Sequence, residues 1–347
     1  MSIRRNAASA RRPGRSGYGG SLQFEYAAGF ADASALLRSG PAPAGPDAKL
    51  RMNEHWTRRC LRGARTRRGE HAQLRGRAYA DGFAAGLHLP KGAWLPVALT
   101  KSAAAVVLAG SRTRLEAVQQ LLRLPLQEIV VVLEDGGEEA FTRLRSLPEI
   151  TIVHTRERLG ADVGRTVGAR MTDAELILFA DGETPVPAER LAGLLEEVQA
   201  GSDLALADVG GQLGAFRGWD DAARIRAFMN WSLGRPELHA NSVAVLPHAW
   251  TRQGMERVGL AQLAVPAMAQ RAAIGLQLRI RCLPMHAARK GGALNGNAGG
   301  TATATTGARL SAGDHIEALR AAMRENGARL ALPDQVRRRF AAEGGGT

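Results

Sequence analysis

Short apolar runs alternate with amphipathic stretches from residue 101 onward. The apolar runs span residues 104–108, 128–133, 150–153 and 176–179, and the amphipathic stretches span residues 115–122, 138–147, 163–171 and 189–198. Runs this short are typical of buried strands, and the stretches between them repeat apolar residues at helical spacing. Because parallel strands need crossover connections, the alternation predicts an α/β fold, with a Rossmann-like, mainly parallel sheet flanked by helices.

The chain after residue 200 carries the same signals in shorter form. We expect strands at residues 204–206, 213–216 and 276–281, an extended segment at 242–246, and helices at 224–233 and up to residue 274. Residues 291–307 are rich in Gly, Asn, Thr and Ala, which predicts a flexible loop. A closing helix from residue 311 through 324 and a frayed tail then complete the chain.

The first 75 residues are interrupted by Pro13-Gly14, Gly19-Gly20 and the Gly/Pro-rich residues 40–46, which predicts a largely disordered arm. One pattern recurs, because Tyr-Ala-Ala-Gly-Phe-Ala at residues 26–31 is echoed by Tyr-Ala-Asp-Gly-Phe-Ala at residues 79–84. The second copy has the spacing of a helix that packs either on its own body or on a partner.

Positive charge is concentrated in the same region. Residues 1–96 contain 17 Lys and Arg against 6 Asp and Glu, a net +11 of the chain's +13. Such an arm could bind nucleic acid or another anionic surface, or it could be a solvated tail. No apolar run approaches the roughly 18 residues that span a bilayer. Two cysteines without metal-site spacing suit a reducing compartment, so we expect a cytoplasmic protein.

The chemistry-bearing residues follow the expected strands, at the carboxyl edge where parallel sheets bind ligands. They are Gly110 and Ser111 after the first strand, Asp135-Gly136 after the second, Arg165 at a helix start, and Asp181-Gly182-Glu183 after the fourth. Two carboxylates one residue apart can hold one divalent cation if the strand geometry continues past Ala180.

The ordered set of motifs resembles the nucleotide-binding half of family 2 glycosyltransferases, which have the GT-A fold. The resemblance runs from about Ala103 to Val198. Family members show Val-Val-Asp-Asp-Gly-Ser, Gly-x-x-x-Ala-Arg-Asn-x-Gly and Leu-Phe-x-Asp-x-Asp. This chain has Val-Val-Leu-Glu-Asp-Gly-Gly at residues 131–137, Gly-Ala-Asp-Val-Gly-Arg-Thr-Val-Gly at 160–168 and Leu-Phe-Ala-Asp-Gly-Glu at 178–183. The whole layout is most similar to glycosyltransferase-like proteins of paenibacilli and related spore formers.

The resemblance implies roles for these residues. Gly110, Ser111, Asp135, Gly136 and Arg165 would bind the nucleotide of a nucleotide-sugar donor. Asp181 and Glu183 would bind its diphosphate through Mg²⁺ or Mn²⁺. Each position also has a structural alternative: an Asp-Gly turn at Asp135, a helix cap at Arg165, and a polar strand exit at Asp181.

The acceptor half departs from the family. The family's Glu-Asp pair, whose Asp is the general base, should fall near residues 263–266, where the sequence is Leu-Ala-Val-Pro. Other residues qualify by type alone, and the base is left unassigned. These residues are Asp220, Asp221, Glu237, Glu256 and His286.

We therefore expect a metal-assisted glycosyltransferase with an unknown acceptor. Two alternatives are open: an inactive nucleotide- or sugar-binding scaffold, and an adaptor that uses the basic arm. The expected organisation is an arm (1–75), a short helix and linker (76–96), a donor-binding half (97–200), an acceptor half (201–290), a flexible loop (291–310) and a C-terminal helix and tail (311–347).

Overall fold

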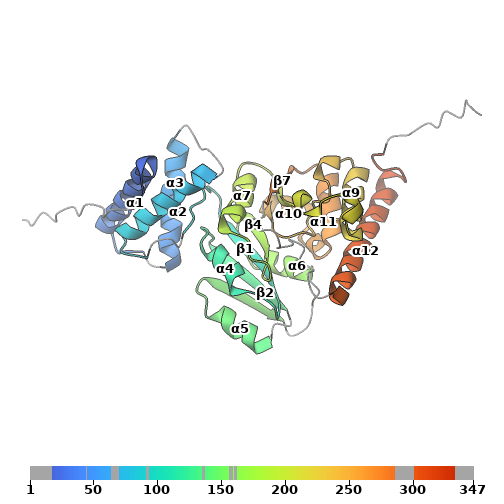
Figure 1. Ribbon diagram of the computed structural model, residues 1–347, viewed down its shortest axis with the longest axis horizontal. Helices are drawn as coiled ribbons and strands as arrows, with labels where there is room; N and C mark the ends of the chain where they lie inside the picture. The colour runs from blue at the N-terminus through green and yellow to red at the C-terminus, as the bar shows by residue number, and fades with distance from the viewer. Residues whose placement is uncertain are drawn as a thin grey trace, which may run out of the picture.

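The computed structural model describes residues 18–43, 45–63, 70–90, 94–134, 137–155, 159, 162–285 and 301–332, with backbone only for residues 137 and 301–309. Three N-terminal helices form a bundle beside an α/β body, and further helices close the opposite side (Figure 1).

A seven-stranded sheet runs through the body in the order β3-β2-β1-β4-β6-β5-β7. Its strands are β1 (Ala103–Ala109), β2 (Glu128–Glu134), β3 (Ile150–Thr155), β4 (Leu176–Asp181), β5 (Leu204–Asp208), β6 (His248–Thr251) and β7 (Ile280–Pro284). All pairings are parallel except those of β6, which is antiparallel to both β4 and β5. The prediction of an α/β fold with a mainly parallel sheet flanked by helices is confirmed.

Helices cover both faces of the sheet. One face packs against α4 (Leu115–Leu122), α5 (Gly137–Arg145) and α7 (Ala188–Gln199), and the other packs against α6 (Val163–Arg170), α10 (Arg252–Val258) and α11 (Pro266–Gly275). The sheet separates two hydrophobic cores, and alternate residues of β1 point into them. Val107 lies in the core under α4, α5 and α7, and Val106 lies in the core under α6, α10 and α11. Burial of both faces explains why the strands have continuous apolar runs.

Two expectations for the second half of the chain are wrong, and the strand expected at residues 276–281 begins only at Ile280. Residues 242–246 form turns, and the strand begins after them, at His248. Residues 213–216 form no strand, because the chain makes the short helices α8 (Gly210–Leu213) and η1 (Phe216–Gly218) there. Residues 213–216 follow β5 and residues 242–246 precede the antiparallel β6, so both segments lie beyond the carboxyl edge of the parallel strands.

Helices close the remaining side of the body. They are α9 (Asp221–Ser232), η2 (Pro236–Leu238), η3 (Leu260–Ala264) and α12 (Thr301–Asn326), and α12 packs on α9 and α11. The expected closing helix is present but begins earlier, so residues 301–307 of the expected loop are helical, while residues 286–300 lie outside the described residues. None of the described helices is long and apolar enough to cross a membrane.

The expectation of a disordered arm is corrected from residue 20 onward. The chain there forms α1 (Gly20–Ser39), α2 (Gly45–Arg62) and α3 (Glu70–Gly86), which share a core built around Met52, Trp56 and Tyr79. Gly40, Pro41 and Pro43 follow the end of α1, and Gly45 and Pro46 begin α2. Residues 1–17 lie outside the described residues.

The repeated motif explains how α1 and α3 cross. A Cβ on Gly29 would lie 2.0 Å from the Tyr79 carbonyl oxygen, and one on Gly82 would lie 1.9 Å from the Tyr26 carbonyl oxygen. Each copy therefore supplies the glycine on which the backbone of the other copy rests. Tyr26 and Tyr79 are buried beside this crossing, so the repeat packs against itself inside the bundle.

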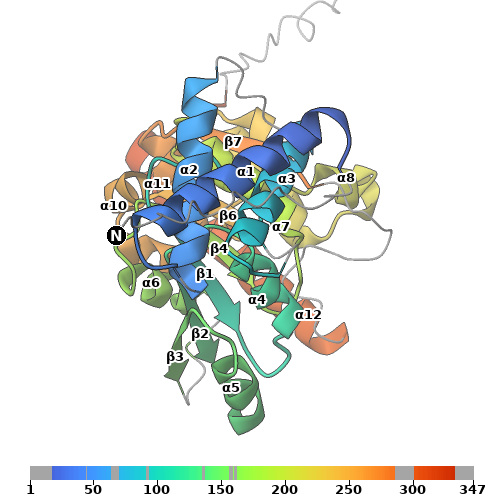
Figure 2. The ribbon, with the colours of Figure 1, turned by 90° about the vertical axis from the view of Figure 1, so that its left-hand side faces the viewer.

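The bundle is attached to the α/β body by polar contacts of α2 and α3. Lys49 Nζ bonds the Glu149 carboxylate at 2.5 Å and the Leu122 carbonyl at 3.0 Å. The Asn53 side chain accepts from the Val97 N–H at 2.9 Å. Figure 2 views the molecule from the bundle side, with α1 to α3 in front of the sheet. These contacts fix the bundle as part of the folded protein.

Candidate functional site

Asp181 is the last residue of β4, a central strand whose preceding five residues are buried. Its Oδ1 accepts a hydrogen bond from the Glu183 N–H at 2.9 Å, so the chain turns directly after Asp181. Strand geometry therefore persists to the first carboxylate and ends before the second. Asp181 projects beyond the carboxyl edge of the sheet, where ligands of parallel sheets bind.

Gly182 joins this turn to the loop after β1. Its N–H donates to the Leu108 carbonyl at 2.8 Å, and its carbonyl accepts from the Arg114 N–H at 2.8 Å. A Cβ at this position would lie 2.9 Å from the Leu108 oxygen, so a side chain would force the two segments apart. The glycine between the carboxylates is thus required for the close approach of the loop that carries Gly110 and Ser111.

The loop after β1 is braced from inside. The Gly110 N–H donates to Thr113 Oγ1 at 2.8 Å, and Thr113 is buried under the turn at Gly182. Ser111 at the tip is exposed. The structure thereby brings Gly110, Ser111 and Asp181 to neighbouring turns, as the predicted donor site requires.

The two carboxylates differ in their fit to a divalent cation. Among the described residues Asp181 Oδ2 has no hydrogen-bond or ion-pair partner, so this oxygen suits a metal ligand. Glu183 instead pairs with Arg112, whose Nη2 lies 2.9 Å from Oε2 and 3.2 Å from Oε1. Within the described residues no group of three His, Cys, Asp or Glu could hold a metal ion. A cation here would need further oxygens from a bound diphosphate, and Glu183 would have to leave Arg112 to join it.

Two predicted nucleotide-binding residues, Asp135 and Gly136, lie outside the described residues, as does Gly160 of the glycine motif. The preceding Glu134 ends β2 at the same edge of the sheet. Its carboxylate lies near α6, because a Cβ on Gly164 would meet Glu134 Oε1 at 3.2 Å.

Arg165 lies beneath the edge of the site. Only 3% of it is exposed, and its guanidinium pairs with Asp162 and donates to the Ala244 carbonyl at 3.4 Å. A direct contact with phosphate would require Asp162 to move away. The predicted role at the phosphates is therefore still a prediction, and in this structure Arg165 ties the start of α6 to residues 241–246.

The glycines that follow in this motif serve packing. A Cβ on Gly168 would lie 2.2 Å from Val106 Cγ1, and one on Gly164 would lie 3.1 Å from Leu108 Cδ2. These glycines are four residues apart and face β1 together. They allow α6 to lie close against the sheet, which places the helix start beside the carboxyl edge.

Asp208 is a carboxylate at the same edge that sequence reasoning did not single out. Phe179 of β4 pairs with His248 of β6, which in turn pairs with Leu206 of β5. Asp181 lies two residues after Phe179, and Asp208 lies two residues after Leu206. Because β4 and β5 run in the same direction, the two aspartates lie at the same level and on the same face of the sheet. Two strand spacings separate their backbones, roughly 10 Å.

The surroundings of Asp208 hold it in place. Its Oδ1 accepts from the Gly210 N–H at 2.8 Å and from Asn241 Nδ2 at 3.1 Å, while the Asn241 oxygen accepts from the Val209 N–H. Oδ2 has no hydrogen-bond or ion-pair partner in the described part of the chain. Cys282 lies nearby as a neutral thiol, because burial raises its pKa to about 11. One oxygen of Asp208 is thus oriented and the other is available.

The carboxylates named from the sequence have local partners instead. Asp220 caps α9 by accepting from the Ala223 N–H at 2.6 Å, Asp221 pairs with Arg224 at 3.3 Å, and Glu237 pairs with Arg235 at 2.5 Å. Glu256 is exposed on α10, and His286 lies outside the described residues. Residues 263–266, near which the family's Glu-Asp pair is expected, contain no carboxylate, and Leu263 among them is fully buried in the core.

His248 is a further titratable group near the site. It is fully buried on β6, its ring centroid lies 5.1 Å from that of Phe179 with the rings tilted by 30°, and its Nδ1 lies 3.0 Å from the Val245 carbonyl oxygen. Burial, with the positive charge of Arg165, lowers the pKa of His248 to about 3. A buried imidazole of such low basicity supports the core and is a poor proton acceptor.

No protein-family model and no curated protein sequence matches the chain. Solved structures are similar at low identity. Mannosyl-3-phosphoglycerate synthase from Rubrobacter xylanophilus is 13% identical with a TM-score of 0.47, over 68% of this chain and 78% of that one. Glucosyl-3-phosphoglycerate synthase from Mycobacterium tuberculosis, solved with Mn²⁺, UDP and glucosyl-3-phosphoglycerate, is 13% identical with a TM-score of 0.46, over 68% and 82%.

A third similar structure is the mannosyltransferase PcManGT from Pyrobaculum calidifontis, solved with GDP-Man and Mn²⁺. It is 13% identical with a TM-score of 0.38, over 88% of this chain and 86% of that one. A shared arrangement of strands at such identities does not carry over an activity, because unrelated functions occur on one fold. Function must come from the residues of this chain.

Proposed function

We propose that this protein transfers a sugar from a nucleotide-diphosphate-sugar donor to an acceptor hydroxyl. The observation that carries the proposal is the pair Asp181 and Asp208, level with each other on one face at the carboxyl edge of the sheet. Each has one carboxylate oxygen without a partner among the described residues. The donor half and the acceptor half of a transfer site would then each have one carboxylate.

On the donor side, Asp181 would hold Mg²⁺ or Mn²⁺ together with the donor diphosphate. A divalent cation bound there supplies positive charge to a nucleoside diphosphate as it leaves the sugar. The braced loop at Gly110 and Ser111 would form the wall of the nucleotide pocket, and Asp135 would contact the base. Glu183 would also bind the cation once it has released Arg112. Arg112 would then be available to bind the phosphates.

On the acceptor side, we assign Asp208 as the general base. Its bonds to Gly210 and Asn241 orient the carboxylate, and Oδ2 would accept the proton of the acceptor hydroxyl as that oxygen attacks the sugar. The separation of roughly 10 Å between the two strand ends leaves room for a sugar ring between the carboxylates. This assignment replaces the base that the sequence lacks near residues 263–266.

A non-catalytic scaffold is the second candidate, and two observations favour it. Residues 263–266, near which the family's base is expected, contain no carboxylate, and Glu183 is already paired with Arg112. A scaffold would bind the nucleotide sugar without turning it over. Binding and turnover must therefore be measured separately.

The test is calorimetry of the full chain with UDP and GDP, with and without Mn²⁺. We expect Mn²⁺-dependent binding of one nucleotide, lost in Asp181→Asn and kept in the control Asp173→Asn, which removes an exposed carboxylate. The absence of nucleotide binding under every condition, or equal binding by both variants, would overturn the donor site. Hydrolysis of a bound nucleotide sugar then distinguishes the enzyme from the scaffold.

A further inference from the structure

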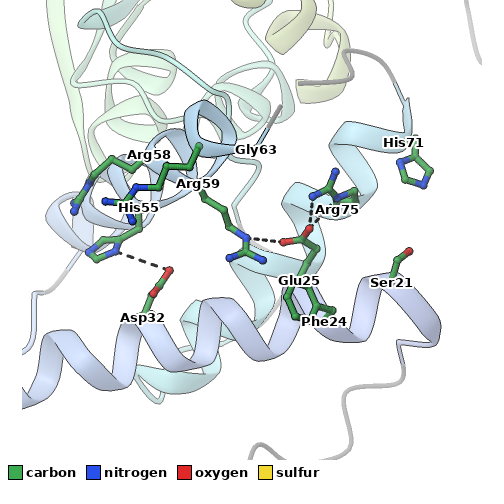
Figure 3. Close-up of a pocket in the computed structure, with 11 residues that line it drawn as sticks. Ser21, Phe24, Glu25, Asp32, His55, Arg58, Arg59, Gly63, His71 and Arg75 are labelled. Carbon is green, nitrogen blue, oxygen red and sulfur yellow. Dashed lines mark hydrogen bonds and ion pairs between the residues drawn. The ribbon is translucent and has the colours of Figure 1, made fainter. Parts of the chain in front are cut away.

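The N-terminal bundle carries an open pocket of about 690 Å³, whose lining residues are separate from those of the strand-end site. Basic side chains from two helices line it, and Figure 3 labels Arg58 and Arg59 from α2 and His71 and Arg75 from α3. Arg62 of α2 also lines the pocket. Its volume lies in the range of small-molecule sites, which is roughly 300 to 1,000 Å³.

Glu25 of α1 fixes two of these arginines. It is 3% exposed, and its carboxylate accepts from Arg59 Nε at 2.9 Å and from Arg75 Nε at 2.9 Å. The dashed lines of Figure 3 show both guanidinium groups converging on this one carboxylate. One carboxylate thus pairs with two guanidinium groups. This pairing fixes the orientation of Arg59 and Arg75 and leaves a net positive charge on the three side chains.

The other arginines of the pocket add to this excess. Arg58 and Arg62 are four residues apart on α2 and therefore share a face. Arg58 is 3.8 Å from Glu54, which also pairs with Arg51 at 3.2 Å, and Arg62 has no ion pair or hydrogen bond among the described residues. Of the two acidic side chains lining the pocket, Asp32 also accepts from the Tyr79 hydroxyl at 2.6 Å. Four arginines against two carboxylates leave a formal charge of +2.

An aromatic surface borders these charges. Phe24 is 67% exposed, and the Arg59 guanidinium carbon lies 5.3 Å from its ring centroid. An exposed ring beside a guanidinium offers a stacking surface for a planar group such as a nucleobase.

We propose that this pocket is a second ligand site, which binds an anion with at least two phosphoryl groups. Guanidinium groups bind phosphate oxygens in pairs, and the α2 and α3 sides of the pocket present them from two directions. A free nucleoside diphosphate or triphosphate and a single strand of nucleic acid share this chemistry. The strand-end site is not needed for this binding.

The test titrates the full chain, without divalent cations, with tripolyphosphate, ADP and a short oligothymidylate. We expect Arg58→Gln/Arg62→Gln to weaken binding roughly tenfold or more, because charged hydrogen bonds to phosphate are lost. These two substitutions keep the pairing of Glu25 with Arg59 and Arg75, so we expect the bundle to stay folded. Arg51→Gln, on the same helix but outside the pocket, is the matched control and should bind as the parent does.

The three probes distinguish a free nucleotide from a nucleic-acid strand, and the variants distinguish this pocket from the strand-end site. Tighter binding of ADP than of tripolyphosphate, reduced by Phe24→Ala, would support a free nucleotide, and tightest binding of the oligothymidylate would support a strand. Asp181→Asn should leave all of these affinities unchanged, so failure of the donor site does not affect this result. No binding of any probe, or equal weakening by Arg51→Gln, would overturn the second site.

Discussion

Lys49 and Glu149 form an ion pair at 2.5 Å between the N-terminal bundle and the residue that precedes β3. Lys49 is 1% exposed, so its ammonium group depends on this partner and on the Leu122 carbonyl. We predict that Glu149→Gln lowers the free energy of unfolding by about 3 kcal/mol, because it leaves a buried charge without its counter-ion. Urea denaturation measures this loss.

Glu138→Gln is the control for that substitution. Glu138 is exposed at the start of α5 and has no ion pair within the described residues, so its loss should change stability by less than about 0.5 kcal/mol. Equal stability of the two variants would show that the bundle does not depend on the Lys49 contact.

We predict opposite effects on stability for two Gly→Ala substitutions, one at the crossing of α1 and α3 and one on α7. Gly82→Ala places a Cβ 1.9 Å from a backbone oxygen and should destabilise the fold by about 3 kcal/mol, since the helices must separate. Gly193→Ala on α7 meets its nearest atom at 3.7 Å and should be neutral or stabilising by up to about 1 kcal/mol. Thermal unfolding of both variants tests this, and a stable Gly82→Ala protein would contradict the crossing.

The assignment of Asp208 predicts a loss of turnover without a loss of donor binding. Asp208→Asn should slow sugar transfer by about 10² to 10⁴, the usual contribution of a general base, while the nucleotide affinity stays within about twofold. Glu237→Gln and Asp221→Asn, which remove carboxylates with local partners, should leave transfer unchanged. Unimpaired transfer by Asp208→Asn would remove this residue from the reaction.

The buried His248 predicts a dependence of stability on pH. Its pKa falls from 6.5 to about 3 on folding, because of burial and the charge of Arg165, so below pH 6.5 the unfolded chain binds a proton that the folded chain does not. The free energy of unfolding should therefore fall as pH falls from 6.5, by up to about 1.4 kcal/mol per pH unit for this residue. Urea titrations between pH 7 and 5 should show a smaller slope in His248→Gln, and an unchanged slope would contradict the assignment.

The strands before residue 181 could be predicted because burial on both faces requires continuous apolar runs, as in Val130 to Leu133. The antiparallel β6 could not, because it has only four residues and pairs with β4, some seventy residues earlier. Nothing local in the sequence encodes that insertion. Yet it sets the spacing between Asp181 and Asp208.

The residues of the candidate site also divide into those that the local sequence indicates and those that depend on the fold. Asp181 and Gly110 stand out locally, since each follows an apolar strand, and Asp208 follows Leu-Ala-Leu-Ala in the same manner. The apolar run before Asp208 is only four residues long, so its signal is weaker than that of the preceding strands. The pairing of Glu183 with Arg112 and the burial of Arg165 depend on the fold and were not predictable from spacing.

The mutual packing of the two Tyr-x-x-Gly-Phe copies has a consequence for how this chain can vary. Inserting one residue before Gly29 or Gly82 turns that glycine by about 100° around its helix and brings a side chain to the crossing. A length change in either copy is therefore tolerated only if a glycine again lies at the crossing. The two segments are coupled in register although about fifty residues of sequence separate them.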